Sequence, residues 1–145
     1  MKLLRKAILA GEVCPYCRRG TYLVDSSIIY SGKSYGPVYI CGSCDAYVGV
    51  HKGTKRALGR LANQELRYWK KEAHAEFDPL WHFISEERGV SLNEARSMCY
   101  KWLSDKMGTP LDETHIGMFD VDECKRVIQF CRPVLKKIKE RGRNA

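Results

Sequence analysis

The sequence lacks the features that define several large classes of protein. No stretch approaches the roughly 18 consecutive apolar residues of a membrane span, and Arg5 and Lys6 make the run at residues 3–10 too broken for a signal peptide. A chain of 145 residues is also too short for an α/β barrel of about 250 residues. Internal repeats, low-complexity segments and a Pro- or Ser-rich linker are absent as well. These absences predict a soluble, cytoplasmic protein without membrane contact.

Cysteine spacing is the most specific signal that the sequence carries. Four of the seven cysteines form two C-x-x-C pairs, separated by 23 residues. Two thiolates three positions apart on a tight turn can face one metal ion, and a second such turn completes a tetrahedral zinc site. The alternative, a redox-active C-x-x-C motif, is typically found next to a βαβ pattern, and the sequence lacks such a pattern. The predicted ligands of one structural zinc ion are Cys14, Cys17, Cys41 and Cys44.

The segments around the two pairs predict a zinc ribbon of antiparallel strands. Residues 22–24 and 28–30 flank a polar turn, residues 38–40 lead into the second pair, and residues 46–50 follow it. Such a module of about 50 residues buries too little surface to fold alone, so its folding should depend on zinc. The other cysteines fall on apolar helical spacings and are expected in the core: Cys99, Cys124 and Cys131.

After residue 51 the apolar spacing becomes helical. Helix starts are indicated by Asp78 before a proline, by a capping box at Ser91 and Glu94, and by a similar box at Asp120. The expected helices cover about residues 55–76, 78–89, 91–108 and 120–132, with a short final helix after Pro133. The predicted fold class is therefore α+β, with an N-terminal zinc ribbon (residues 1–53) packed on a helical domain of three to five helices (residues 54–145) that ends in a basic tail.

Charge is distributed unevenly along the chain. The formal net charge of +8 divides into +9 for residues 1–71, −6 for residues 72–131 and +5 for residues 132–145. Lys/Arg clusters bind phosphate backbones through charge and counterion release, and tyrosines between them can stack on unpaired bases. The predicted nucleic-acid face comprises Arg18, Arg19, Lys33, Lys52, Lys55 and Arg56. The partner on this hypothesis is DNA or RNA; the alternative is an adaptor that docks on a host or phage protein.

Several motifs are together typical of one family. They are Cys14-Pro-Tyr-Cys17, Ser34-Tyr-Gly36, the run from Cys41-Gly-Ser-Cys44 to His51-Lys-Gly-Thr54, Leu58-Gly-Arg-Leu-Ala62, Glu65-Leu-Arg67, Ala73-His74 and Phe77-Asp-Pro-Leu-Trp81. Through these motifs the chain resembles the zinc-finger-containing phage and prophage proteins of uncharacterised function. The resemblance implies the four-cysteine zinc site, a phage or mobile-element origin and a bacterial host cell. The chain departs from the family pattern at Ala57, in place of a proline, and at Thr114, in place of a cysteine.

Polar residues inside the family motifs form a second-tier candidate site. Its members are His51, Thr54, His74, Asp78 and His115. His74 and Asp78 would share one face of a continuous helix, and with His115 they would suggest a metal-dependent nuclease or hydrolase. However, Asp78 suits a helix cap, and His115 lies in an apolar connector that is typical of a core histidine. Because P-loop, G-x-S-x-G and H-E-x-x-H motifs are also absent, we predict no catalytic residue and keep the enzyme as an alternative.

Overall fold

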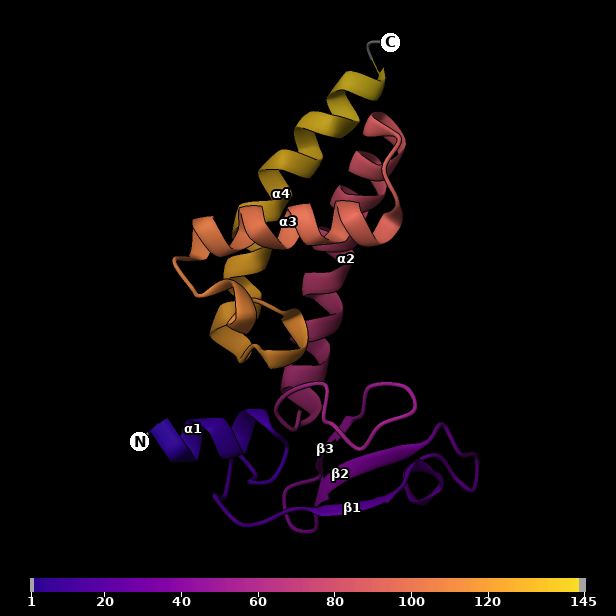
Figure 1. The fold of residues 1–145 in the computed structure, drawn as a ribbon, viewed down its shortest axis with the longest axis vertical. Helices are drawn as coiled ribbons and strands as arrows, with labels where there is room; N and C mark the ends of the chain where they lie inside the picture. The colour runs from indigo at the N-terminus through magenta and orange to yellow at the C-terminus, as the bar shows by residue number, and fades with distance from the viewer. Residues whose placement is uncertain (1, 144–145) are drawn as a thin grey trace. The chain divides into compact units, whose positions relative to one another are not determined.

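The computed structural model describes residues 2–143 and shows helices together with one antiparallel sheet (Figure 1). The elements of this described part are α1 (Lys2–Leu9), β1 (Tyr22–Asp25), β2 (Pro37–Cys41), β3 (Ala46–Gly49), α2 (Gln64–Arg88), α3 (Leu92–Met107) and α4 (Val121–Arg143), with three short 3-10 turns between them. The predicted α+β class is confirmed. The predicted helical domain contains the α-helices α2, α3 and α4, which lie within the expected three to five, whereas α1 lies in the predicted ribbon region.

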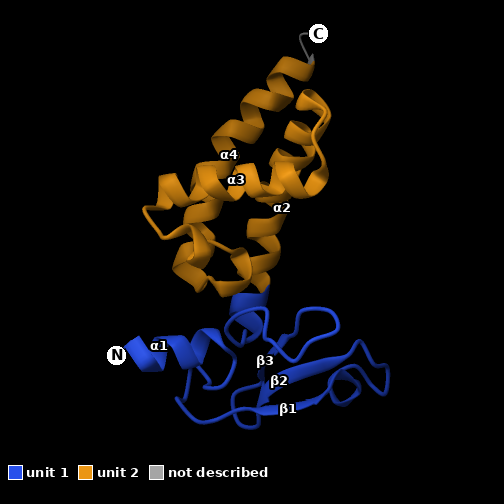
Figure 2. Cartoon of the chain, viewed as in Figure 1, with its two compact units in different colours: residues 1–67 blue, residues 68–145 orange. Residues whose placement is uncertain are grey.

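Contacts divide the chain into two compact units, residues 1–67 and residues 68–145 (Figure 2). The division falls inside α2, further along the chain than the boundary after residue 53 that the sequence predicts. Residues 57–62 belong with the ribbon because they continue its hydrogen-bonding pattern. Isolated bridges join Val50 to Ala57 and Tyr47 to Ala62 beside β3.

The first unit is built on a three-stranded antiparallel sheet in the order β1-β2-β3. Its register pairs Tyr22 with Ile40 and Cys41 with Ala46, so the second C-x-x-C pair follows the end of β2 directly. The side chains packed around the metal-binding cysteines form a small apolar cluster. Its buried members are Cys14, Cys41, Ala46, Val48, Ala57 and Leu61. The predicted four-cysteine ribbon is thus present at the N-terminal strands.

The expected strand at residues 28–30 is wrong. Asp25 ends β1 and caps a 3-10 turn at Ser26–Ile28, where its carboxylate accepts a hydrogen bond of 2.8 Å from the backbone N–H of Ser27. The Asp-Ser-Ser sequence favours this local capped turn over the expected hairpin at residues 25–27. The partner of β1 is therefore β2, which lies further along the chain.

The helix expected at residues 55–76 is also wrong in its first part. The backbone N–H of Leu58 donates to the Gly49 carbonyl at 3.0 Å, and that of Ala62 donates to the Tyr47 carbonyl at 2.9 Å. An extended segment can bury Ala57, Leu61 and Ala62 against β3, although their spacing also suits a helix. Helix α2 begins only after Asn63, whose side-chain oxygen accepts from the N–H of Leu66 at 3.0 Å and caps it.

The predicted helix start at Asp78-Pro79 is wrong because α2 runs through Pro79 without interruption. An internal proline costs a helix about 3 kcal/mol. Burial of Ala73, Phe77 and Leu80 on both sides of it offsets this cost, since all three are packed in the core of the second unit. Pro133 lies inside α4 in the same way, so the break expected there is wrong too.

Local capping signals correctly predicted both ends of α3 and the start of α4. The N–H of Glu94 donates to the Ser91 hydroxyl at 3.1 Å at the start of α3, and Gly108 ends that helix with a left-handed φ of 68°. Asp120 and Glu123 exchange side-chain hydrogen bonds with each other's backbone N–H groups at 2.9 and 3.1 Å, which is a capping box. In the sequence, α1 carried no comparable signal and was not predicted.

The second unit has a core of its own. Its fully buried side chains include Phe77, Leu103, Ile116, Phe119 and Val127. The three remaining cysteines are buried there as expected: Cys99, Cys124 and Cys131. Neither α2 nor α4, the longest helices in the described residues, has a stretch apolar enough to cross a membrane.

Candidate metal centre

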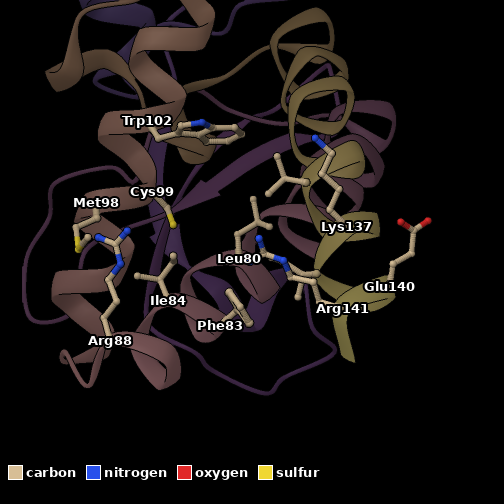
Figure 3. A pocket seen from close by; sticks show the side chains of 12 residues that line it. Leu80, Phe83, Ile84, Arg88, Met98, Cys99, Trp102, Lys137, Glu140 and Arg141 are labelled. Atoms are coloured by element: carbon tan, nitrogen blue, oxygen red, sulfur yellow. The ribbon is translucent and has the colours of Figure 1, made fainter. Parts of the chain in front are cut away.

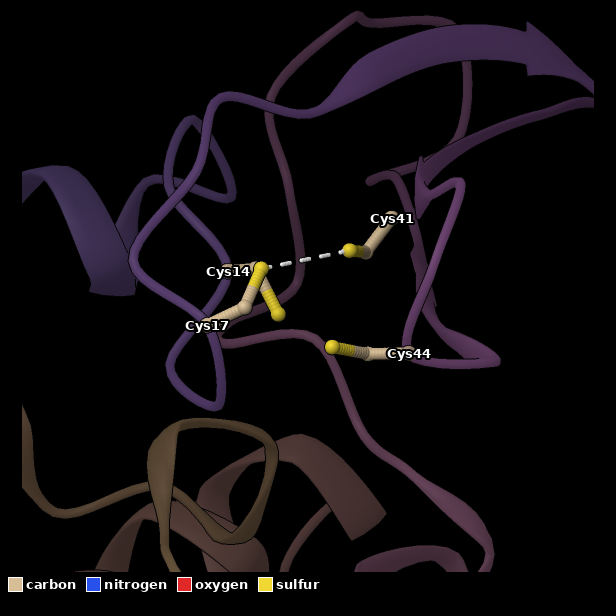
Figure 4. Close-up of side chains that lie close together, drawn as sticks. All are labelled: Cys14, Cys17, Cys41 and Cys44. Atoms are coloured by element: carbon tan, nitrogen blue, oxygen red, sulfur yellow. Dashed lines mark hydrogen bonds between the residues drawn. The ribbon is translucent and has the colours of Figure 1, made fainter.

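Each C-x-x-C pair lies on a tight turn, called a knuckle below. The four predicted ligands meet where the two knuckles lie together, at the knuckle end of the ribbon (Figure 4). A bridge between Val13 and Gly20 closes the first knuckle, and the N–H of Arg18 donates to the Cys14 carbonyl at 2.9 Å inside it. The second knuckle joins β2 to β3. The two tight turns bring all four sulfur atoms within 4.8 Å of one another.

The spacing of the sulfur atoms fits a tetrahedral zinc ion. Four Zn–S bonds of about 2.3 Å require sulfur atoms about 3.8 Å apart. The Cys17 and Cys41 sulfur atoms are 3.6 Å apart. Cys14 and Cys41 are buried, and Cys17 and Cys44 are half-buried. A site of four thiolates has no open position for water or substrate, so the centre holds one structural zinc ion.

The protein environment shifts the pKa values of these thiols in different directions. Burial opposes the charged form of Cys41, but hydrogen bonds from the backbone and hydroxyl of Ser43 outweigh it and lower the pKa of Cys41 to about 6. Hydrogen bonding with the Cys17 thiol, followed by burial, raises the pKa of Cys44 to about 12. Burial likewise raises the pKa of Cys14. Zinc binding must therefore displace protons from Cys14 and Cys44 at neutral pH.

All six residues of the predicted nucleic-acid face are exposed, but they fall into two groups. The sheet register places Arg18 and Arg19 at the knuckle end and the other four at the opposite end, where Val38 pairs with Gly49. That second group comprises Lys33, Lys52, Lys55 and Arg56.

The knuckle end carries further basic residues that are not part of the predicted nucleic-acid face. A hollow of about 380 Å³ is lined by Lys2, Leu4, Arg5, Ile8, Arg18 and Arg60. Two of its cations lie on α1, which was not predicted, and Arg60 was assigned to a helix. Only the distribution of positive charge along residues 1–71 could have indicated them.

The second-tier residues serve local structure in each unit. The Thr54 hydroxyl donates to the His51 carbonyl at 2.8 Å and accepts from the N–H of Arg56 at 3.1 Å, so the pair shapes the turn after β3. In the second unit, continuous α2 brings His74 Nδ1 to 3.3 Å from an Asp78 carboxylate oxygen. The Trp81 indole donates to that same oxygen at 3.0 Å. Asp78 thus orients two side chains and is not the helix cap that the sequence predicts.

His115 differs from its prediction as a core histidine. It is exposed, with its ring 5.0 Å from that of Tyr100, whereas the neighbouring Thr114 is buried. Within the described residues, the four cysteines form the only cluster of three or more potential metal ligands, so neither His115 nor another side chain completes a metal site with His74 and Asp78.

Comparison with known proteins agrees with this geometry. A family model described as a zinc-finger-containing domain matches residues 10–134. No curated protein and no solved structure matches the chain.

Proposed function

The chain belongs to the family of zinc-finger-containing domains, and we propose that its zinc-ribbon unit binds nucleic acid through basic side chains positioned by the metal centre. The observation that carries this proposal is the hollow beside the first knuckle. Arg18 reaches it from the knuckle itself, Arg60 from the segment beside β3, and Arg5 from α1. Cations from three separate parts of the chain therefore surround one concave surface, which suits a phosphate group.

The opposite end of the sheet offers a complementary feature. The exposed rings of Tyr30 and Tyr35 meet edge to face at 5.1 Å between centroids, and the Lys33 ammonium lies 5.5 Å from the Tyr35 ring. Exposed aromatic rings next to a cation suit unpaired bases and their phosphates. Single-stranded DNA or RNA is therefore the favoured partner.

The proposal is tested by the salt dependence of binding. Fluorescence anisotropy with labelled single-stranded RNA, single-stranded DNA and duplex DNA should show the logarithm of the binding constant falling linearly with the logarithm of salt concentration. Arg5→Gln should weaken binding and reduce the log-log slope by about 0.7 to 0.9 for the phosphate contact that is lost. Lys6→Gln is the matched control, because Lys6 is the next residue of α1 and does not line the hollow.

Absent or salt-insensitive binding to all three nucleic acids would refute the proposal. A stable protein complex that survives nuclease treatment would instead favour an adaptor that acts on a host or phage protein. The phage or mobile-element origin and the cytoplasm of a bacterial host cell stay predictions from the resemblance.

A further inference from the structure

The second unit contains a cavity that no residue of the zinc ribbon lines. It has a volume of about 780 Å³ and lies between α2, α3 and α4 (Figure 3). Its apolar walls come from all three helices. They are formed by Leu80, Phe83, Ile84, Met98, Trp102, Val134 and Ile138. Six of these seven side chains are only half-buried, so the protein leaves apolar surface facing this space.

The charges at the cavity are mostly positive. Arg88, Lys137 and Arg141 line it, against the single carboxylate of Glu140. In Figure 3 the Arg141 side chain reaches from α4 over the cavity toward Leu80, whereas the Glu140 carboxylate points away from it. Burial raises the pKa of the Cys99 thiol to about 11, so this wall residue adds no negative charge at neutral pH. An apolar space with cations at its edge is complementary to a molecule that is apolar at one end and anionic at the other.

The size of the cavity matches that of small-molecule sites. Such sites typically have volumes of roughly 300 to 1,000 Å³, with mostly apolar walls and a few polar or charged groups. Side chains of three helices line the cavity. The space therefore suits a small ligand with one hydrocarbon chain.

We propose that the cavity between α2, α3 and α4 binds an amphipathic organic anion, with its hydrocarbon body against the apolar walls and one anionic head at Lys137 and Arg141. The proposal is independent of nucleic-acid binding, since every residue that carries it lies in the second unit.

Dodecanoate, dodecanol and decanoate, each below its aggregation concentration, test the proposal by calorimetry on the full zinc-loaded chain. Dodecanoate should bind saturably with one site per chain. Decanoate should bind about tenfold more weakly, because each methylene transferred from water contributes to affinity. Dodecanol should bind about threefold to fivefold more weakly than dodecanoate, because it lacks the charge that pairs with the exposed cations.

Two matched variants locate the anionic head. Lys137→Gln should weaken dodecanoate binding by about threefold and leave dodecanol unchanged. Lys136→Gln removes the same charge from the neighbouring position of α4, which does not line the cavity, and should change neither affinity. Circular dichroism verifies that both variants remain folded.

The three tryptophans provide an internal control for where the hydrocarbon body of the ligand binds. Trp102 lines the cavity, whereas Trp69 and Trp81 do not. In a nitrogen–proton correlation spectrum, dodecanoate should shift the indole signal of Trp102 more than the other two. Equal affinity for dodecanoate and dodecanol, equal losses in the two lysine variants, or binding only to anionic phosphatidylglycerol vesicles would overturn the proposal.

Discussion

The four zinc-binding thiols differ in acidity although they bind the same ion. Ser43 lowers the pKa of Cys41 through hydrogen bonds, whereas Cys44 and Cys14 have raised pKa values. Zinc accepts only thiolates, so each ligand that is protonated before binding must lose its proton. The pKa values of the four thiols therefore determine how steeply zinc affinity depends on pH.

We expect zinc affinity to fall as pH decreases. Near pH 7 the thiols of Cys14 and Cys44 are protonated, so binding releases at least about two protons and the apparent affinity should fall by at least about 100-fold per pH unit. Below pH about 6 Cys41 is also protonated and the dependence should steepen. Competition with a chromophoric chelator between pH 5 and pH 8 gives the slope, for which pH about 6 is the breakpoint. An affinity that does not change with pH would contradict the assignment of these thiols as ligands.

At the scale of elements, the joint between α1 and the ribbon depends on one glycine. Gly11 follows α1 with a left-handed φ of 76°, and a Cβ at this position would lie 2.8 Å from the Cβ of Ala57 and 3.3 Å from the Tyr39 ring. Backbone conformation and close packing therefore both require glycine here. This joint also holds the α1 cations beside Arg18 at the basic hollow.

Gly11→Ala should destabilise the ribbon by at least about 2 kcal/mol, since it combines backbone strain with a clash in a packed region. Gly53→Ala is the matched control, because Gly53 has nearly the same φ of 75° but no heavy atom within 4 Å of an added Cβ. It should cost only about 1 kcal/mol, from strain alone. Release of zinc to a chelator during a denaturant titration reports on the ribbon. Equal losses of stability in both variants would show that the joint is loosely packed.

The elements also show which parts of the fold the sequence could predict. The zinc ligands and the caps at Ser91 and Asp120 were correct, because each depends on a few residues in one local segment. The segment at residues 57–62 was wrong because its apolar spacing suits either a helix or a strand edge, and pairing with β3 decides between them. The helix start predicted at Pro79 was wrong for a related reason. Core packing on both sides of the proline offsets the free-energy cost of a proline inside α2.

The candidate sites differ in the same way, because a local sequence pattern specifies one of them and tertiary packing specifies the others. Metal-ligand spacing identified all four cysteines, whereas the basic hollow joins Arg5, Arg18 and Arg60 from distant parts of the chain. Three helices line the cavity of the second unit, and from the sequence their apolar positions predict only a buried core. Surfaces of this kind require the tertiary structure, because no local pattern specifies which side chains remain at an edge.

At the scale of the whole molecule, the two units depend on zinc to different degrees. The ribbon has a small apolar cluster that includes two of the zinc ligands, Cys14 and Cys41. The second unit has its own core and contains no zinc ligand. All three tryptophans lie in the second unit, so tryptophan fluorescence reports on it alone, whereas the ribbon contains six of the eight tyrosines.

Removal of zinc by a chelator should therefore unfold the ribbon and leave the helical unit intact. We expect the amide signals of β1, β2 and β3 to collapse toward random-coil positions, while the tryptophan emission and most of the helical circular dichroism persist. Cys41→Ser should have the same effect without a chelator, and the purified variant should contain no zinc where the parent chain contains one ion. Cooperative loss of the tryptophan signal together with the ribbon signals would show instead that the helical unit needs the folded ribbon for its own stability.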